Sequence, residues 1–272
     1  MAAFPALPAD FEPTRATLHA YANAVAVLPR VHAVPHPKWW HISLKVRPDG
    51  LVTESMPLPG GGAVFVRMDL RSNEIVIEGS RGDRRSFPMN AGLTATEMGD
   101  ALIQAAADMG LTAEYNRDKF ENDDARPYDG EHAAGLFEAL VTAETAIERQ
   151  RNRISGEIGP IQLWPHGFDL AFEWFGTVMV PHEEEGEVTE LPAQINLGFY
   201  PAGDAYFYSN PWPFDGDALL NVELPEGARW NTDGWEGSMF QYADLADRSD
   251  GIERFLDFAG AVFDAASPLL TR

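Results

Sequence analysis

The stretch "IQLWPHGFDLAFEWFGTVMV", residues 161–180, decides the fold that the sequence predicts. After the Pro-His-Gly break at 165–167, large apolar residues take every second position, with smaller or acidic residues between them. A period of two turns one set of side chains to a core and the other to an open face, as in an antiparallel strand. The apolar set is Phe168, Leu170, Phe172 and Trp174, and the intervening set is Asp169, Ala171 and Glu173. The stretch therefore predicts a long strand entered through a turn that carries a histidine.

A second aromatic stretch, "WWHISLKV" at 39–46, has the same period. We expect a strand here, with Trp40, Ile42, Leu44 and Val46 on one face and His41, Ser43 and Lys45 on the other. Further runs follow at hairpin spacing, separated by Gly, Pro, Asn and Asp: "LVTESMPL", "AVFVRMDL", "EIVIEG", "RRSFPM", "AQINLGFYP" and "DAYFYSNPW". Their spacing predicts antiparallel meanders.

Apolar residues at helical spacing predict the helices. We expect them from Thr14 to a stop at Pro29, from a capping box of Thr94 and Glu97 to Gly110, from Glu131 to Ile154, and from Gly251 to Ala266. The predicted fold class is α+β, with antiparallel sheets and helices packed on one face.

The order of predicted elements repeats along the chain. Each half reads as a helix, an aromatic strand start with a histidine, antiparallel strands and a helix, and the polar connection at 115–130 separates them. This predicts two pseudo-repeated halves, 1–125 and 126–272, that share one core. The alternative is a chance likeness of short patterns. A seam between such halves would favour a pocket.

The charge balance limits the partners. The chain has a formal net charge of −22 and no stripe of Lys or Arg, so nucleic acid and an anionic membrane are excluded as expected partners. Solubility is the plain explanation of this acidity.

The chain contains no cysteine, which excludes disulfides, zinc–thiolate sites, iron–sulfur clusters and a cysteine nucleophile. The opening "MAAFPALPADFEPTR" has no signal-peptide pattern, and no apolar run reaches the roughly 20 residues of a membrane span. We therefore expect a cytoplasmic protein.

Three residues are candidates for acid–base chemistry. His166 lies in a turn in which Gly167 can adopt a positive φ and aim the imidazole, and Asp169 follows close enough to orient it. The alternative is that Asp169 accepts backbone N–H bonds of its own turn. His41 is either a general base facing a cleft or a structurally paired histidine.

Aromatic residues next to these candidates would line the pocket. The expected ligand-binding set is Trp39, Trp40, Ser43, Trp164, Gly167 and Phe168. No Gly-x-Ser-x-Gly elbow and no phosphate-binding glycine motif occurs, so no nucleophile elbow and no cofactor is evident. We expect no transition metal, because the histidines form no His-x-His or His-Glu-x-x-His pair. A set of His36, His41 and His166 is the alternative.

Several segments together resemble a known family. "HPKWWHISLKV", "GPIQLWPHGFDLAFEWF" and "LGFYPAGDAYFYSNPWP" look like the DUF5996 family of bacterial proteins, and the likeness follows most of the chain in order. The resemblance implies that His41, His166, Gly167 and Asp169 stand in motif positions, and it implies no particular chemistry. One departure is "ELPAQIN" at 190–196, where the family pattern is expected to contain His-Glu.

The sequence thus predicts a small-molecule enzyme of unassigned acid–base or hydrolytic reaction, with His41, His166 and Asp169 in an aromatic-lined pocket. A non-catalytic protein that binds a small ligand, or an acidic protein-interaction module, is the alternative.

Overall fold

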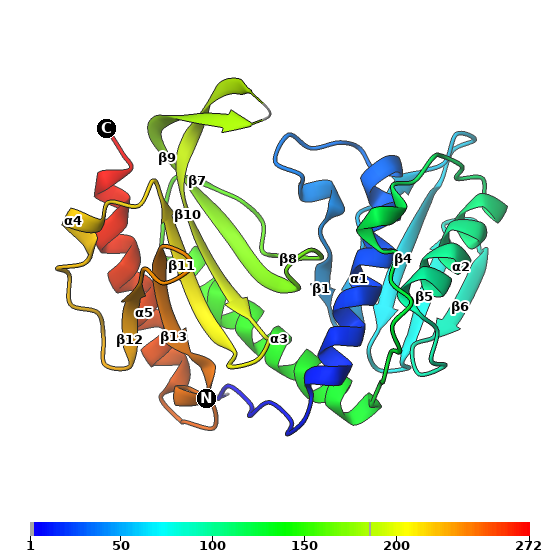
Figure 1. Cartoon of the computed structure of the whole chain (residues 1–272), viewed down its shortest axis with the longest axis horizontal. Coiled ribbons are helices and arrows are strands. Elements are labelled where there is room, and N and C mark those ends of the chain that lie inside the picture. The colour runs from blue at the N-terminus through cyan, green and yellow to red at the C-terminus, as the bar shows by residue number, and fades with distance from the viewer. Residues whose placement is uncertain (1–2, 185) are drawn as a thin grey trace. The chain divides into compact units, whose positions relative to one another are not determined.

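The computed structural model describes residues 3–184 and 186–272 (Figure 1). The chain divides into two compact units, and neither is one continuous stretch. The N-terminal unit consists of Leu7–Leu140 and Gln162–Asp169, and the C-terminal unit consists of Met1–Ala6, Val141–Ile161 and Leu170–Arg272. The expected halves, 1–125 and 126–272, concern a duplication rather than compactness, so they stay a prediction.

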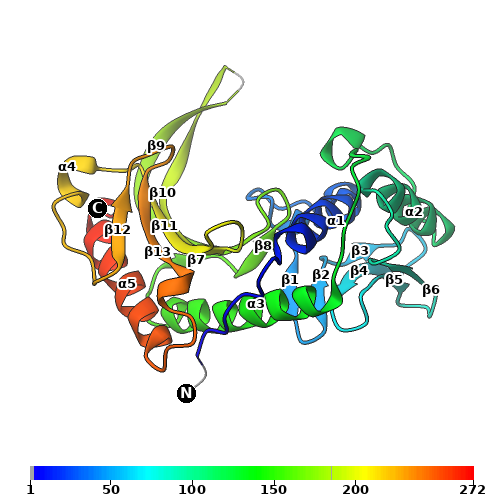
Figure 2. The ribbon, with the colours of Figure 1, turned by 60° about the horizontal axis from the view of Figure 1, so that its bottom comes forward.

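The N-terminal unit is built on an antiparallel sheet in the order β1-β2-β4-β5-β6, with β3 also paired to β4. Its strands are β1 (Lys45–Arg47), β2 (Gly50–Val52), β3 (Met56–Pro57), β4 (Ala63–Asp69), β5 (Glu74–Gly79) and β6 (Arg84–Pro88), together with β8 (Gln162–Trp164), which is not part of this sheet. Its helical segments are α1 (Glu12–His32), η1 (Trp40–Ile42), α2 (Ala95–Asp108) and η2 (Arg117–Lys119). Figure 2 shows α1 and α2 on the same face of the sheet. Alternate residues of β4, namely Val64, Val66 and Met68, are fully buried.

The C-terminal unit has an antiparallel sheet in the order β12-β13-β11-β10-β9-β7. Its strands are β7 (Glu157–Ile158), β9 (Asp169–Glu184), β10 (Glu187–Tyr200), β11 (Tyr206–Trp212), β12 (Ala228–Asn231) and β13 (Gly237–Gln241). The helical segments are α4 (Gly216–Leu219), η3 (Tyr242–Asp244), α5 (Gly251–Ala266) and η4 (Ser267–Leu269), while α3 (Gly130–Arg151) contributes to both units.

Helix α5 covers one face of this second sheet (Figure 1). The ring of Phe255 lies 4.3 Å from that of Phe207 on β11, and Phe263 meets Trp174 on β9 at 5.2 Å. The apolar set of β9, Leu170, Phe172 and Trp174, is buried as its period predicts, and Phe168, just before the strand, is buried too. The α+β class and the antiparallel sheets are therefore confirmed.

Several predicted boundaries are wrong. The helix expected to end at Ile154 ends at Arg151. Residues 39–44 do not form a strand, because Trp39 adopts the left-handed region (φ 59°) and Trp40–Ile42 close a 3-10 turn, so β1 begins only at Lys45. Pro29 does not end α1, which continues to His32. A proline in the last turn removes only one helical hydrogen bond, and the Ala33 N–H donates to the Pro29 carbonyl to close the end.

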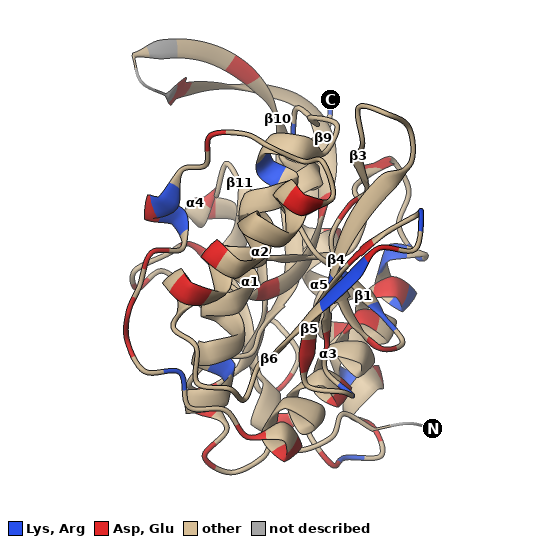
Figure 3. Ribbon diagram, turned by 90° about the vertical axis from the view of Figure 1, so that its right-hand side faces the viewer, with Lys and Arg blue, Asp and Glu red and all other residues tan. Residues whose placement is uncertain are grey.

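Acidic side chains greatly outnumber basic ones, 42 Asp and Glu against 20 Lys and Arg. Asp and Glu occur on helices, strands and loops alike, and Lys and Arg are few (Figure 3). Of the helices in the described residues, none combines the length and the apolar character required to cross a membrane.

The predicted capping box at the start of α2 is confirmed. The Thr94 hydroxyl accepts from the Glu97 N–H at 3.1 Å, and the Glu97 carboxylate accepts from the Thr94 N–H at 2.8 Å. Each bond pairs a backbone N–H that the helix itself leaves without a partner.

We expect Thr94→Ala to lower the free energy of unfolding by about 1 kcal/mol, since it removes the N-cap acceptor. Urea unfolding followed by circular dichroism measures this. Thr112→Ala, an exposed position beyond the same helix, is the control and should stay within about 0.5 kcal/mol of the wild type. Equal effects of the two substitutions would show that the cap contributes nothing.

Candidate functional site

The predicted site residues all belong to the N-terminal unit, in two segments far apart in sequence. The segment 39–44 follows α1, and the segment 162–169 contains β8. Leu44 and Leu163 join them by a pair of backbone hydrogen bonds of 2.9 and 2.8 Å. The structure thus brings the two motif segments side by side.

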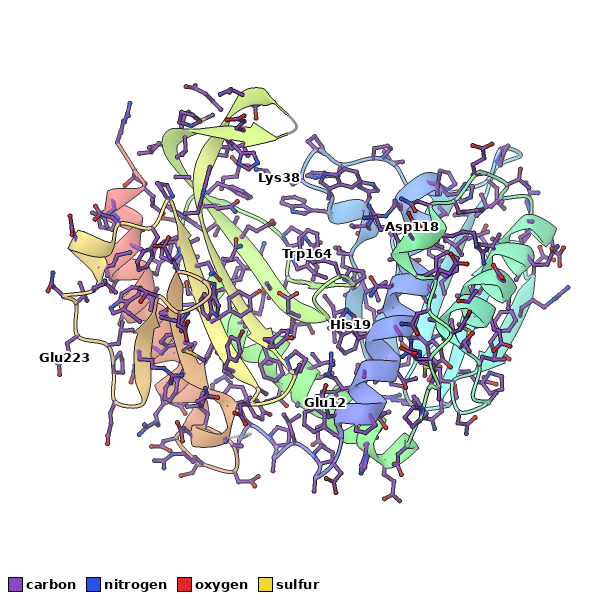
Figure 4. The ribbon with its side chains drawn as sticks, viewed as in Figure 1. Glu12, His19, Lys38, Asp118, Trp164 and Glu223 are labelled. Carbon is purple, nitrogen blue, oxygen red and sulfur yellow. The ribbon has the colours of Figure 1, made fainter. Side chains whose placement is uncertain are left out.

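Five side chains, from the last turn of α1 and the segment after it, form a group that we call the aromatic cluster: Arg30, His36, Trp39, Trp40 and His41. The rings of His36 and Trp40 lie 4.2 Å apart and nearly parallel, at 11°. Trp39 stacks on His41 at 5.5 Å, and the Arg30 guanidinium lies 5.6 Å from the Trp39 ring. Trp39 is 54% exposed, so the cluster presents a large aromatic surface. Lys38 marks this segment in Figure 4.

His41 is buried, with 6% of its surface exposed. Its Nδ1 accepts a hydrogen bond of 3.1 Å from the His36 N–H, which places the proton of the neutral ring on Nε2. Burial lowers the pKa of His41 below 6.5, and the positive charges of Arg30 and His36 lower it further. His41 is therefore a neutral donor near pH 7 rather than a free general base.

Ser43 belongs to a buried polar network. The Lys45 ammonium donates to the Ser43 hydroxyl at 3.1 Å and to the Gln162 Oε1 at 2.6 Å, and it pairs with Glu54 at 3.4 Å. The Ser43 hydroxyl lies 2.7 Å from the Trp40 carbonyl and 2.5 Å from the Gln162 Oε1. Ser43 is fully buried, so its position suits holding η1 against β8 rather than direct contact with a ligand.

The turn after β8 is held by α1. His19 on α1 donates through Nε2 to the His166 carbonyl at 3.0 Å, and its ring lies 5.8 Å from that of Phe168. His166 itself is exposed, with its ring 5.8 Å from that of Trp164. Figure 4 shows His19 and Trp164 on their elements. Burial lowers the pKa of His19, and the hydrogen bond that its ring donates to the His166 carbonyl opposes this shift.

The positive φ expected at Gly167 is found one residue later. Phe168 adopts φ 53° and is fully buried, and its N–H donates to the Trp164 carbonyl at 2.7 Å, which closes the turn. Gly167 is needed for a different reason, since a Cβ there would lie 2.5 Å from the Asp169 Oδ1. The carboxylate of Asp169 therefore folds back against its own turn, and the residue is half-buried rather than mostly buried.

The three proposed acid–base residues have different surroundings. His41 is buried and bonded within the aromatic cluster, His166 is exposed beside Trp164, and Asp169 lies against Gly167. Sequence reasoning missed His19 and Gln162, which link the second segment to the first. His19 stands one turn after Arg15, whose guanidinium lies 3.5 Å from its Nδ1, but no local pattern signals its distant partner.

One sequence feature emerges once the cluster is located. Residues 13–48, which form α1 after its first residue Glu12, then η1 and the start of the sheet, contain no Asp or Glu, although the chain has 42. The same residues include Arg30 and Lys38 at the aromatic cluster. This part of an acidic protein is therefore locally basic.

Other surface features lie elsewhere. Two depressions of about 490 and 520 Å³ in the C-terminal unit are lined by α3 with α5 or with residues 160–161, and by none of the predicted site residues. Within the described residues, no group of three or more His, Asp or Glu side chains is placed to hold a metal ion.

A comparison with family models gives a match over residues 4–271, to a family described as "Family of unknown function (DUF5996)". This confirms the resemblance expected from the sequence. No curated protein and no solved structure matches the chain.

The pKa of His41 predicts a pH dependence of stability. Because the folded-state pKa lies below the unfolded value of about 6.5, the unfolded chain binds more protons at acid pH. The stabilisation is fully present above about pH 6.5 and is lost as the pH falls through the folded-state pKa. We expect the His41 ring proton in NMR, assigned with His41→Asn, to titrate with a midpoint below 6.5. A midpoint at or above 6.5 would contradict the buried, neutral ring.

Proposed function

As a member of DUF5996, the chain belongs to a family without a described activity, and we propose from its geometry that it binds a small planar anion at the aromatic cluster. The observation that carries this proposal is the state of Trp39, a bulky residue with φ 59° whose side chain is 54% exposed. A positive φ is unfavourable for a bulky residue, and an exposed indole loses the benefit of burial. Residues in such rare backbone conformations concentrate at ligand sites.

The charge around Trp39 suggests the class of ligand. The Arg30 guanidinium lies against the ring, burial lowers its pKa, and residues 13–48 around it in the sequence contain no Asp or Glu. A cation beside an exposed indole favours a planar molecule with a carboxylate, which stacks on the ring and pairs with the guanidinium. His41 would support the indole from within as a neutral, stacked ring.

Catalysis on the bound molecule is the second candidate. The exposed imidazole of His166, next to Trp164 and held through its backbone by His19, favours it. In that case His166 would exchange protons with the substrate, Asp169 and Gly167 would shape the turn, and His41 would contribute as a donor. Acid–base or hydrolytic chemistry fits these groups.

The composition suggests the setting of this activity. We infer that its partner is a small molecule, since the net charge of −22 disfavours nucleic acid and anionic membranes. We propose a bacterial, cytoplasmic protein on the family resemblance. No cofactor or metal is assigned to it.

Binding of matched planar probes tests the proposal. We expect 2-naphthoate to bind the full chain and its uncharged amide to bind more weakly, as measured by saturation-transfer NMR and calorimetry. Trp39→Ala should weaken naphthoate at least tenfold, or about 1.4 kcal/mol, and Trp39→Phe should retain most of the affinity because it keeps a ring.

The charge is tested with Arg30→Gln, which should remove the preference for naphthoate over the amide while leaving the amide unchanged. Absence of binding at millimolar concentration, or equal affinity in Trp39→Ala, would refute the site. If the bound molecule is a substrate, His166→Ala should abolish turnover with little change in Kd.

A further inference from the structure

The C-terminal sheet has a second face, opposite the one that α5 covers. Residues that alternate with the core residues of β9, β10 and β11 point to it. This face is polar and aromatic rather than apolar: Glu173, Gln194, Asn196, Tyr200, Tyr206, Tyr208 and Asn210. These side chains are half-buried, so each keeps some contact with solvent.

Two strand glycines shape the aromatic part of this face. Gly198 on β10 stands directly opposite Tyr208 on β11, and a Cβ on Gly198 would lie 2.5 Å from the Tyr208 ring. A Cβ on Gly237 would likewise lie 2.6 Å from the Trp235 ring. The missing Cβ atoms allow both rings to lie down across the backbone. Glycine within a strand is unfavourable and marks such close approaches.

The rings together form a surface that we call the aromatic floor: Tyr200, Tyr206, Tyr208 and Trp235. Trp235 is parallel to Tyr206, with an interplanar angle of 11° and 6.1 Å between centroids. Tyr208 meets Trp235 edge-on at 6.5 Å, and Tyr200 lies 5.4 Å from Tyr206. The floor therefore offers rings at different tilts rather than one flat stack.

A row of polar side chains runs beside the floor. Asn196 on β10 is directly opposite Asn210 on β11 and Glu173 on β9, so the three share the face. The Asn210 Nδ2 donates to the Glu236 carbonyl at 3.0 Å, which fixes that amide. The Asn196 Oδ1 is buried and has no hydrogen-bond partner among the described residues. A buried acceptor of this kind is costly unless a donor reaches it.

We propose that this face binds a neutral saccharide. Sugar rings present C–H faces that pack on aromatic rings, and hydroxyl groups that both donate and accept. A hydroxyl would donate to the Asn196 Oδ1, and Glu173 beside it would accept another. The carboxylate in the row and the net charge of −22 oppose an anionic ligand such as a phosphate. This site lies in the C-terminal unit and goes beyond the one proposed at Trp39.

Titration calorimetry of the full chain with neutral oligosaccharides tests the proposal, with maltohexaose, cellohexaose, xylohexaose and chitohexaose as the probes. We expect at least one to bind with a Kd below 1 mM. Trp235→Ala should weaken that binding at least tenfold. Trp39→Ala is the matched control in the other unit and should leave it unchanged.

Asn196→Leu separates binding from folding. Leucine has a similar size and no acceptor, so the thermal midpoint should stay equal or rise, because the unpaired oxygen is gone. Saccharide affinity should fall at least tenfold. A lowered midpoint with unchanged affinity would assign Asn196 a structural role and overturn the proposal.

Further outcomes refute the saccharide proposal or separate it from the proposed site at Trp39. If none of the four oligosaccharides binds at 10 mM, or if adenine and guanine bind the floor in their place, the face is not a saccharide site. Naphthoate binding that persists in Trp235→Ala while saccharide binding is lost would show that the two sites are independent. Failure of naphthoate binding alone leaves the saccharide result standing.

Discussion

The hydrogen-bonded contact between residues 43–45 and Gln162 is the constraint on which the candidate site depends. Ser43 and Gln162 are 119 residues apart, and they meet through a buried amide, a hydroxyl and the Lys45 ammonium. Ser43 and Gln162 are fully buried and the Lys45 ammonium is partly buried, so loss of one member leaves a buried polar group without its hydrogen bond. It fixes η1 and β8 together, and both motif segments take their places from it.

The sequence reveals the parts of the fold that depend on local periodicity. The alternation from Phe168 to Trp174 predicts β9, and Thr94 with Glu97 predicts the start of α2, because each pattern is sufficient by itself. The segment at Trp39 has a strand pattern as well, yet it turns. Its conformation depends on the stacking of His36 on Trp40 and on the hydrogen bond from the His36 N–H to His41. The spacing of apolar residues in the sequence gives no sign of these contacts.

The sequence predicts which residues belong to the candidate site, but not how their side chains are arranged. Residues from both motif segments, which the expected halves separate, lie in the N-terminal unit. The position of each side chain depends on partners far away in the sequence. His19 holds the turn at His166, and Gln162 is hydrogen-bonded to the buried Ser43. The glycine expected to permit a left-handed turn instead clears room for a carboxylate, and the strained backbone belongs to Phe168. Steric reasons of this kind need three-dimensional neighbours.

The division of the N-terminal unit into Leu7–Leu140 and Gln162–Asp169 has a consequence for synthesis. The chain emerges from the ribosome in order, and a domain usually folds when its last residue is free. Here the first 140 residues contain the whole sheet and its two covering helices, but β8 and Gln162 follow only after the rest of α3 and β7. Until then the nascent unit lacks the Gln162 amide, and the Lys45 ammonium and the Ser43 hydroxyl have only their nearer partners, Glu54 and the Trp40 carbonyl. A chaperone that shields this surface during translation would act before the site exists.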